Sequence, residues 1–418
     1  MEALADGRHY RLYGRNSGKS GIVVPTKIVA ILVTEPNRAD ESLSLTLLDG
    51  ADVTPLFNPV SVAGIKLRNR LVMAPMTRQF SPDGVPGDEV AAYYGRRASS
   101  LGLLLTEGTY VDEGSGGSGR VPRFFGERPL AGWRRVADAV HAEGGAIFPQ
   151  LWHTGATRKP GSGPFPDAPV ISPSGVNAAG ATVGEPATAR QLEAIVAAYA
   201  RAAAAAREGG FDGIELHGAH GYLLDQFHWP RTNRRADSYG GDIRGRVRFS
   251  YEVAAAVREA VGPDFPVAFR FSQWKGGHYD ARIAEDPGEL AAFLAPLADA
   301  GVSMFHVSTR RYWLPAFDDS DRTLAGWTRH LTGLPVIAVG SVGVAAPFLG
   351  VSDDGRSPAD SQRTLTLAPL VDLLTRGEFD LVALGRAVLA DPYWGAKVAE
   401  GRLAEIRPYD KTADATLT

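Results

Sequence analysis

Hydrophobic and polar positions alternate in short blocks along most of the chain, and the clearest block is residues 213–217, Gly-Ile-Glu-Leu-His. Alternation of this kind predicts a strand with Ile214 and Leu216 on one face and Glu215 and His217 on the other. A carboxylate and an imidazole pack poorly against a layer of helices. We therefore expect the second face to line an interior or a site.

From residue 54 onward, such blocks alternate with segments of helical periodicity. The predicted strands are 71–75, 103–107, 146–152, 213–217, 267–271, 304–308, 335–339 and 380–384. The predicted helices are 89–100, 130–143, 189–208, 246–261, 287–300, 324–331, 365–376 and 393–402. Strict alternation of strand and helix over this length predicts an α/β fold, a single (β/α)₈ TIM barrel. No G-x-G-x-x-G stands between a strand and a helix, which counts against a dinucleotide-binding domain.

Two features surround the predicted barrel repeats. A hairpin around Ala63-Gly64 precedes the first strand and is expected to form a lid, and long loops such as 154–187 follow several strands. Residues 54–418 are thus predicted to be one domain. Residues 1–53 match nothing that follows, and we expect a short appended element, a flexible extension, or an upstream stretch that the native start codon omits.

Composition narrows the classes of partner. The 418 residues carry a formal net charge of −3, which gives no electrostatic case for nucleic acid or an anionic membrane. The chain has no cysteine, which excludes disulfides, thiolate nucleophiles and cysteine-bound zinc or iron–sulfur clusters. No run approaches the roughly 18 apolar residues of a membrane helix, and no signal peptide is evident. We expect a cytoplasmic protein with a small-molecule substrate, either a monomer or a homo-oligomer.

Candidate chemistry gathers where the predicted strands end, which is where barrel enzymes place their sites. His217, His220 and Tyr222 are close enough in sequence to converge at one strand end. Two imidazoles and a phenol there can bind a carbonyl or anionic oxygen and supply a proton. A core histidine beside a packing tyrosine is the alternative, and the cluster of three favours a site.

Arg270 is the most informative single position. In Val-Ala-Phe-Arg-Phe-Ser (267–272) the aromatic residues take the helix-facing side, so Arg270 must point into the barrel. A buried guanidinium needs an anion or several acceptors. Either a salt bridge to Glu215 or a bound anionic ligand accounts for it, and the two are compatible. His306 also points inward and is expected to be structural.

The last two strands end in Gly340-Ser341-Val342 and Gly385-Arg386. Loops after the seventh and eighth strands of such barrels commonly bind phosphate, so this pair predicts a phosphorylated ligand. Gln150 can both donate and accept, as pairing with an amide-like ring edge requires, although hydrogen bonding within a loop also explains it. A flat ligand would use aromatic walls, or else these side chains simply pack: Trp152, Trp274, Tyr312 and Trp313.

With these residues in view, the chain resembles the Old Yellow Enzyme family of FMN-dependent ene-reductases over residues 55–402. The resemblance rests on several ordered motifs. They are NRLVMAPMTR (69–78), EGT (107–109), QLWHTG (150–155), HGAHGYLL (217–224) and, after them, Asn233, Arg235, Asp237 and YGG (239–241). The resemblance implies that residues 54–418 bind FMN non-covalently and take electrons from NAD(P)H.

The resemblance also implies a role for each matched residue. Ala74, Pro75 and Met76 would back the flavin ring, Thr77 would lie by its C4 carbonyl, and Gly108 would approach it closely. Gln150 would pair with the pyrimidine edge, and Arg270 would face the N1/O2 edge. The FMN phosphate would bind at Gly340, Ser341, Val342, Gly385 and Arg386.

For the reaction, the resemblance implies hydride transfer from flavin N5 to the β-carbon of an α,β-unsaturated carbonyl, or of a related activated alkene or nitro compound. His217 and His220 would hold the carbonyl oxygen, and Tyr222 would protonate the α-carbon. Trp152 would form a substrate wall, and Tyr312 and Trp313 are expected beside it. The natural substrate and the choice between NADH and NADPH stay open.

The chain departs from the family pattern in places. Arg244-Gly245-Arg246 replaces the usual Glu-Asn-Arg, which puts the start of the following helix in question, and the basic pair Arg310-Arg311 contacts either ligand or solvent. Two alternative functions remain. One is a metal-dependent barrel hydrolase using His217, His220 and Asp225, and the other is a flavin-binding protein without turnover.

Overall fold

The structure, a computed structural model, describes residues 2–5, 8–11, 51–344 and 366–418. The chain divides into two compact units, Met1–Ser42 and Leu43–Thr418. In the first unit, β1 (Glu2–Ala5) and β2 (Arg8–Arg11) form an antiparallel hairpin. The predicted extension, residues 1–53, lies mostly outside the described residues. Residues 345–365, between the seventh barrel strand and the next helix, also lie outside them.

The second unit is a closed barrel of parallel strands, which confirms the predicted fold. The strands are β5 (Leu71–Met73), β6 (Leu103–Tyr110), β7 (Ala146–Trp152), β8 (Ile214–His220), β9 (Val267–Lys275), β10 (Met304–Ser308), β11 (Val336–Val339) and β12 (Leu381–Leu384). Each strand pairs with the next in sequence, and β12 closes the ring on β5. Consecutive pairing brings all the strand ends that carry candidate chemistry to one rim.

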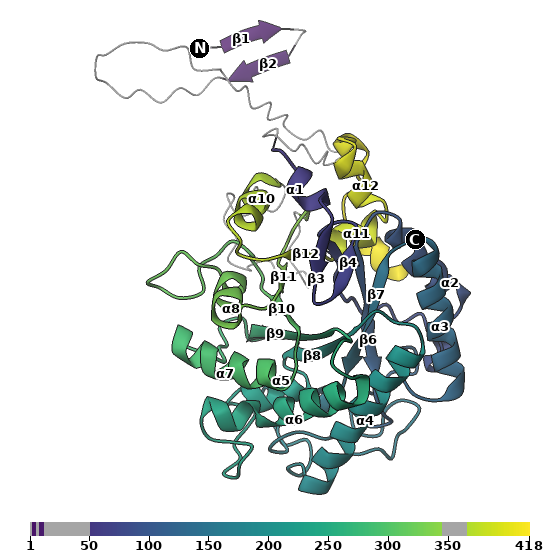
Figure 1. Ribbon diagram of the computed structural model, residues 1–418, viewed down its shortest axis with the longest axis vertical. Helices are drawn as coiled ribbons and strands as arrows, with labels where there is room; N and C mark the ends of the chain where they lie inside the picture. Colours follow the sequence, from purple (N-terminus) through teal and green to yellow (C-terminus); the bar gives the residue numbers. More distant parts are fainter. Residues whose placement is uncertain (1, 6–7, 12–50, 345–365) are drawn as a thin grey trace. The chain divides into compact units, whose positions relative to one another are not determined.

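Helices cover the outside of the barrel (Figure 1). The main ones are α2 (Asp88–Ala98), α3 (Glu127–Ala142), α4 (Ala189–Glu208), α6 (Ile243–Val261), α7 (Pro287–Asp299), α8 (Leu324–Thr332), α10 (Ala368–Thr375) and α12 (Trp394–Ala399). Three further short helices, which the sequence pattern did not predict, are α1 (Thr54–Phe57), α5 (Leu223–His228) and α11 (Arg386–Ala390). The 3₁₀ turns are η1 (Pro82–Gly84), η2 (Gly155–Thr157), η4 (Leu403–Glu405) and η5 (Lys411–Ala415).

Side-chain caps explain where several helices begin. Thr188 and Gln191 form a reciprocal capping box at the start of α4. Asp242 accepts the Gly245 N–H at the start of α6, so this helix forms despite the departure at 244–246. A Cβ at position 245 would overlap the carbonyl oxygen of Gly240, so glycine fits the tight approach made here.

The barrel interior changes character along its axis. An apolar layer at the amino-terminal side includes Phe148, Ala268 and Met304, and it packs against Val62 and Leu67 of the hairpin β3 (Val60–Val62)–β4 (Ile65–Leu67). Because successive inward side chains are two residues apart, the next layer along these strands is Gln150, Arg270 and His306. The hairpin therefore closes the apolar end of the barrel, and the polar layer lies toward the carboxyl ends of the strands.

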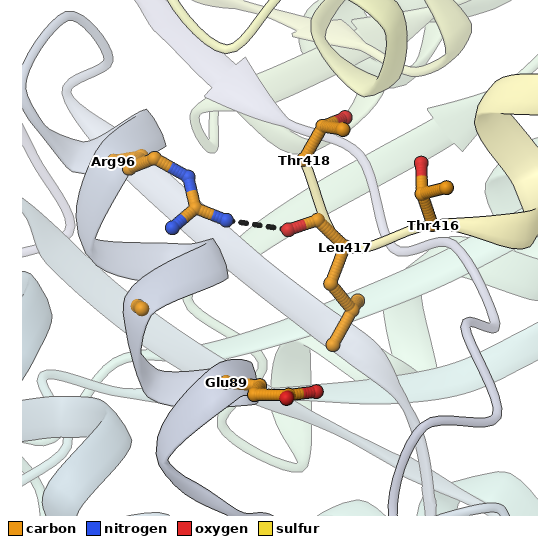
Figure 2. A pocket seen from close by; sticks show the side chains of 6 residues that line it. Glu89, Arg96, Thr416, Leu417 and Thr418 are labelled. Atoms are coloured by element: carbon orange, nitrogen blue, oxygen red, sulfur yellow. Dashed lines mark hydrogen bonds between the residues drawn. The ribbon is translucent and has the colours of Figure 1, made fainter.

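The carboxyl-terminal segment packs against α2. Arg78 donates to the carbonyl oxygens of Ala413, Asp414 and Thr416, and Arg96 donates to that of Leu417 (Figure 2). A cavity of about 360 Å³ between α2 and residues 416–418 is lined by none of the predicted site residues. The described ranges contain no helix with both the length and the apolar character needed to cross a membrane.

Candidate active site

A hydrogen-bonded polar layer crosses the barrel below its rim. Gln150 donates from Nε2 to Oε1 of Glu215 at 2.8 Å, and His306 Nδ1 lies 2.6 Å from Oε2 of the same carboxylate. Burial alone would raise the pKa of Glu215, but His306, Arg270 and Gln150 together lower it. Glu215 is therefore a buried anion, and His306 has the structural role expected of it.

Arg270 enters this layer from β9, pointing inward as predicted. Among the described residues its side chain makes one hydrogen bond, to Ser308, whose Oγ lies 3.5 Å from Nη2, and its Nε is sealed from solvent without a partner. Arg270 and Glu215, both described, do not approach within the 4.0 Å of an ion pair, so the salt-bridge explanation is wrong. A buried guanidinium that has so few hydrogen-bond acceptors is suited to binding an electron-rich edge of a ligand.

Four rings meet above the polar layer, and we call Trp152, His217, His220 and Tyr222 the four-ring cluster. The His217 ring centroid lies 5.2 Å from that of His220 and 5.0 Å from that of Tyr222. Trp152 lies 4.8 Å from Tyr222 and 6.2 Å from His217. The predicted convergence of His217, His220 and Tyr222 is thus confirmed, with Trp152 beside them.

The environment keeps these groups neutral. Burial, followed by the charge of Arg270, holds the pKa of both His217 and His220 well below the ordinary value. Burial raises the pKa of Tyr222, and Arg270 offsets part of that rise. At neutral pH the cluster therefore presents two uncharged imidazoles and a phenol that retains its proton, and each of the three can donate a hydrogen bond.

A sharp turn after β8 places His220 and Tyr222. His220 has φ of 64° and Gly221 has φ of 84°, and a non-glycine residue in this region needs support from its surroundings. Ser272 Oγ accepts the His220 N–H at 3.1 Å, and Asp225 Oδ2 accepts the Gly221 N–H at 2.7 Å. The strand reaches His220, beyond the predicted end at His217, because β9 continues alongside it to Lys275.

The loop after β5 is anchored by a buried carboxylate. Glu107 Oε2 accepts the N–H of Arg78 at 2.8 Å and that of Gln79 at 3.1 Å. Thr77, the residue just before them, is exposed at the barrel rim, and Pro75 and Met76 are half-buried. Residues 74–77 therefore form a fixed stretch of backbone beside the open end of the barrel, and their role in backing a ring stays a prediction.

Gly108 and Gly340 make close approaches that a side chain would block. A Cβ at Gly108 would lie 2.6 Å from Cε3 of Trp152, and one at Gly340 would lie 2.7 Å from Oγ1 of Thr309. Both approaches are to protein atoms, so these two glycines are needed for packing within the protein whether or not a ligand binds. Their predicted contacts with a cofactor stay predictions.

The two predicted phosphate loops stand on neighbouring strands. Ser341 after β11 has φ of 61°, and Gly385 precedes the first residue of α11, Arg386. β12 pairs with β5, and a Cβ at Gly385 would lie 3.6 Å from Sδ of Met76. Gly385, in one of the predicted phosphate loops, is therefore a neighbour of the predicted ring-backing stretch at the rim.

The four candidate aromatic residues, Trp152, Trp274, Tyr312 and Trp313, fall into two groups in the structure. Trp274 stacks on His220 with ring centroids 4.5 Å apart, so it belongs beside the cluster. Among the described residues, ring contacts join Tyr312 to Trp313 at 5.0 Å but join neither to the four-ring cluster. Arg310 packs 3.8 Å over the Tyr279 ring.

The metal-hydrolase alternative fails on Asp225. Its Oδ1 lies 2.7 Å from Nζ of Lys275, and its Oδ2 accepts the Gly221 N–H, so its carboxylate does not join the two imidazoles. In the parts of the chain that are described, no three histidine, aspartate or glutamate side chains could hold a metal ion together. Lys275 was missed from the sequence because its partner is distant in the chain.

The donor set fits a flavin mononucleotide. Arg270 offers a poorly matched cation, and Gln150, with Nε2 committed to Glu215, keeps its carbonyl oxygen for a ring N–H. The ring-backing stretch is adjacent to a glycine–arginine loop suited to phosphate.

Comparison with known proteins agrees with this geometry. Residues 55–346 match the NADH:flavin oxidoreductase / NADH oxidase family. An NADH oxidase of Thermoanaerobacter brockii is 36% identical over 368 residues, 84% of this chain and 52% of that protein. The 12-oxophytodienoate reductase 7 of Oryza sativa subsp. japonica is 41% identical over 276 residues, 62% of this chain and 69% of the reductase. The chain thus spans about half the length of the first relative.

Two solved structures are similar to this chain in fold and in sequence. Morphinone reductase in complex with tetrahydroNAD superposes with a TM-score of 0.70 and 28% identity, covering 86% of this chain and 93% of the reductase. Old Yellow Enzyme from Pichia sp. AKU4542 superposes with a TM-score of 0.71 and 28% identity, covering 86% of this chain and 90% of that enzyme.

Proposed function

Because the chain belongs to the NADH:flavin oxidoreductase / NADH oxidase family, as its resemblance to Old Yellow Enzyme predicted, we propose that it reduces an alkene conjugated to a carbonyl group. Membership makes the chain an NAD(P)H-dependent flavin oxidoreductase with FMN as its cofactor. The proposed substrate class is supported by relatives named 12-oxophytodienoate reductase and chanoclavine-I aldehyde reductase.

The four-ring cluster is the observation that carries this proposal. Neutral His217 and His220 bind the carbonyl oxygen of the substrate, and their hydrogen bonds strengthen as negative charge develops on that oxygen. This polarises the alkene and makes its β-carbon electrophilic. FMN, when bound, supplies the hydride chemistry between NAD(P)H and that carbon.

Tyr222 completes the reduction as a general acid. Its phenol lies beside His217, and its raised pKa keeps the proton in place until the α-carbon becomes basic. Trp152, in edge contact with Tyr222, limits where the alkene can lie. Tyr312 and Trp313 stay in the proposal only as outer walls of the substrate site.

The remaining residues bind the cofactor. Ala74, Pro75, Met76 and Gly108 contact the ring, Thr77 lies by its C4 carbonyl, and Gln150 accepts from its pyrimidine edge. Arg270 stabilises the charge of the reduced ring, because a buried cation favours the more negative form. Gly340, Ser341, Val342, Gly385 and Arg386 bind the phosphate. This assignment rests on the rim geometry and the family motifs.

The test is a comparison of the two half-reactions in Tyr222→Phe. Anaerobic stopped-flow absorbance follows flavin reduction by NADPH and then reoxidation by cyclohexenone. We expect reduction to change little and reoxidation to slow by roughly 10²–10⁴-fold, the usual worth of a positioned general acid. Tyr199→Phe, which removes a buried hydroxyl on α4, is the control. Equal slowing of both half-reactions would contradict the role given to Tyr222.

A further inference from the structure

The two imidazoles of the four-ring cluster are held through different ring nitrogens. His217 accepts the N–H of Ala219 on Nδ1 at 3.3 Å. A neutral imidazole has one N–H and one bare nitrogen, so His217 carries its hydrogen on Nε2. His220 is contacted instead at Nε2, by Oγ of Ser308 at 2.8 Å. Distances alone leave open which of these last two atoms is the donor.

The surroundings of the Ser308 hydroxyl set the direction of its bond with His220. A guanidinium has donors and no acceptor, so Nη2 of Arg270, 3.5 Å from Ser308 Oγ, can only donate to that oxygen. A serine oxygen has two lone pairs, so this bond still leaves room for a second donor. The Ser308 hydroxyl is buried, however, and Nε2 of His220 is the one acceptor within reach of its hydrogen among the described residues. The hydroxyl therefore donates to that nitrogen, and the hydrogen of His220 lies on Nδ1.

The backbone of Ser308 also holds the plane of the His220 ring. Trp274 stacks on His220 with ring centroids 4.5 Å apart and 28° between the planes. The indole Nε1 of Trp274 donates to the carbonyl oxygen of Ser308 at 3.1 Å. One residue of β10 therefore contacts the ring directly and fixes the aromatic surface on which the ring lies.

We propose that Ser308 is a positioning residue that fixes His220 as its Nδ1–H tautomer, so that His217 and His220 donate to one substrate oxygen through unlike nitrogens. The tautomer follows from the contacts above, whereas its use in binding a carbonyl rests on the proposed function. Neither His217 Nε2 nor His220 Nδ1 has a partner within the described residues, and neither is sealed from solvent.

The charge state of His220 supports the need for a fixed tautomer. Burial, then Arg270, His217, Lys275 and His306, keep the pKa of His220 well below its ordinary value. A protonated ring would donate from both nitrogens and would not need Ser308. A neutral ring offers only one donor, and an incorrect tautomer would present a bare nitrogen to the carbonyl oxygen of the substrate.

The test is a two-bond ¹H–¹⁵N correlation spectrum of the holoenzyme labelled with [¹⁵N]histidine, in which the two neutral tautomers give distinct patterns. A His220→Gln variant identifies the His220 signals. We expect Nδ1–H in the unmodified protein, and a shift toward Nε2–H in Ser308→Ala. Ser308→Thr keeps the hydroxyl and should restore the original pattern. Ser272→Ala is the matched control, because Ser272 contacts the backbone N–H of His220 and not its ring.

A second measurement tests whether the tautomer of His220 contributes to substrate binding. In Ser308→Ala we expect the KM for cyclohexenone to rise about tenfold, the worth of one lost hydrogen bond, with recovery in Ser308→Thr. Nε2–H in the unmodified protein, or an unchanged pattern in Ser308→Ala, would overturn the proposal. An Nδ1–H pattern in a holoenzyme that does not turn over cyclohexenone would instead reject the proposed substrate class and leave the tautomer assignment standing.

Discussion

Lys275 Nζ lies 2.7 Å from Asp225 Oδ1, and neither side chain has any exposed surface. The same carboxylate holds the N–H of Gly221, and Lys275 also donates to the carbonyl oxygen of Ser272 at 3.0 Å. This buried ion pair therefore ties the turn that carries His220 and Tyr222 to the end of β9.

Lys275→Met should destabilise the protein by about 3–5 kcal/mol, because it leaves Asp225 as a buried charge without its partner. Adding Asp225→Asn should recover most of this loss. Urea unfolding at a fixed FMN concentration measures both variants. Arg376→Met breaks an exposed pair with Asp372 and should change the free energy of unfolding by at most about 0.5 kcal/mol. A Lys275→Met variant as stable as this control would contradict the expectation.

Glu107 should make stability depend on pH. Burial raises the pKa of Glu107 from 4.5 to about 7. The hydrogen bonds from the backbone N–H groups of Arg78 and Gln79 lower the pKa but do not cancel this rise. Between these values the folded protein holds a proton that the unfolded chain releases. The free energy of unfolding therefore falls as pH rises through this window, by up to about 1.4 kcal/mol per pH unit, and this contribution is constant above it.

Glu107→Gln does not titrate, so its stability relative to the unmodified protein should increase between pH 5 and pH 8. Urea midpoints at the two pH values measure the difference. Glu208→Gln, at an exposed position on α4, controls for the loss of one carboxylate elsewhere. A stability difference that is the same at both pH values would show that Glu107 is ionised throughout.

Gly108→Ala should displace Trp152. The added Cβ would lie 2.6 Å from Cε3 and 2.9 Å from Cδ2 of the indole, which is itself packed against Tyr222. Overpacking of this kind costs about 1–3 kcal/mol of stability and should alter the near-ultraviolet circular dichroism. Gly119→Ala, whose Cβ would meet nothing within 4 Å, should change neither. An unchanged spectrum in Gly108→Ala would mean that Trp152 lies elsewhere.

Arg78→Met should release the carboxyl-terminal segment. The guanidinium donates to the carbonyl oxygens of Ala413 at 3.0 Å, Asp414 at 3.2 Å and Thr416 at 2.7 Å. Hydrogen bonds from a charged donor are worth about 1.5–3 kcal/mol, so amide exchange in residues 411–418 should accelerate roughly 10–100-fold. Arg96→Met, which loses only the bond to Leu417 in Figure 2, should have a smaller effect. Equal exchange in both variants would argue against this role of Arg78.

The sequence by itself determined the barrel and the local part of the site. Strand and helix periodicities repeat so regularly that every barrel strand was found. The errors were three missed short helices and misplaced ends, as at His220, where pairing with β9 extends the strand. His217, His220 and Tyr222 lie within six residues of one another, so their convergence follows from the geometry of one strand end. The inward direction of Arg270 likewise follows from the two-residue period of a strand.

Only the tertiary structure decided which groups those residues contact. Gln150 and Glu215 are 65 residues apart, Asp225 and Lys275 are 50 apart, and His220 and Ser308 are 88 apart. Each pair joins different strands or their loops, and its geometry depends on the register and closure of the whole barrel. Sequence pattern gives the direction in which one side chain points, whereas a hydrogen bond between strands requires two side chains to be placed within a fraction of an ångström.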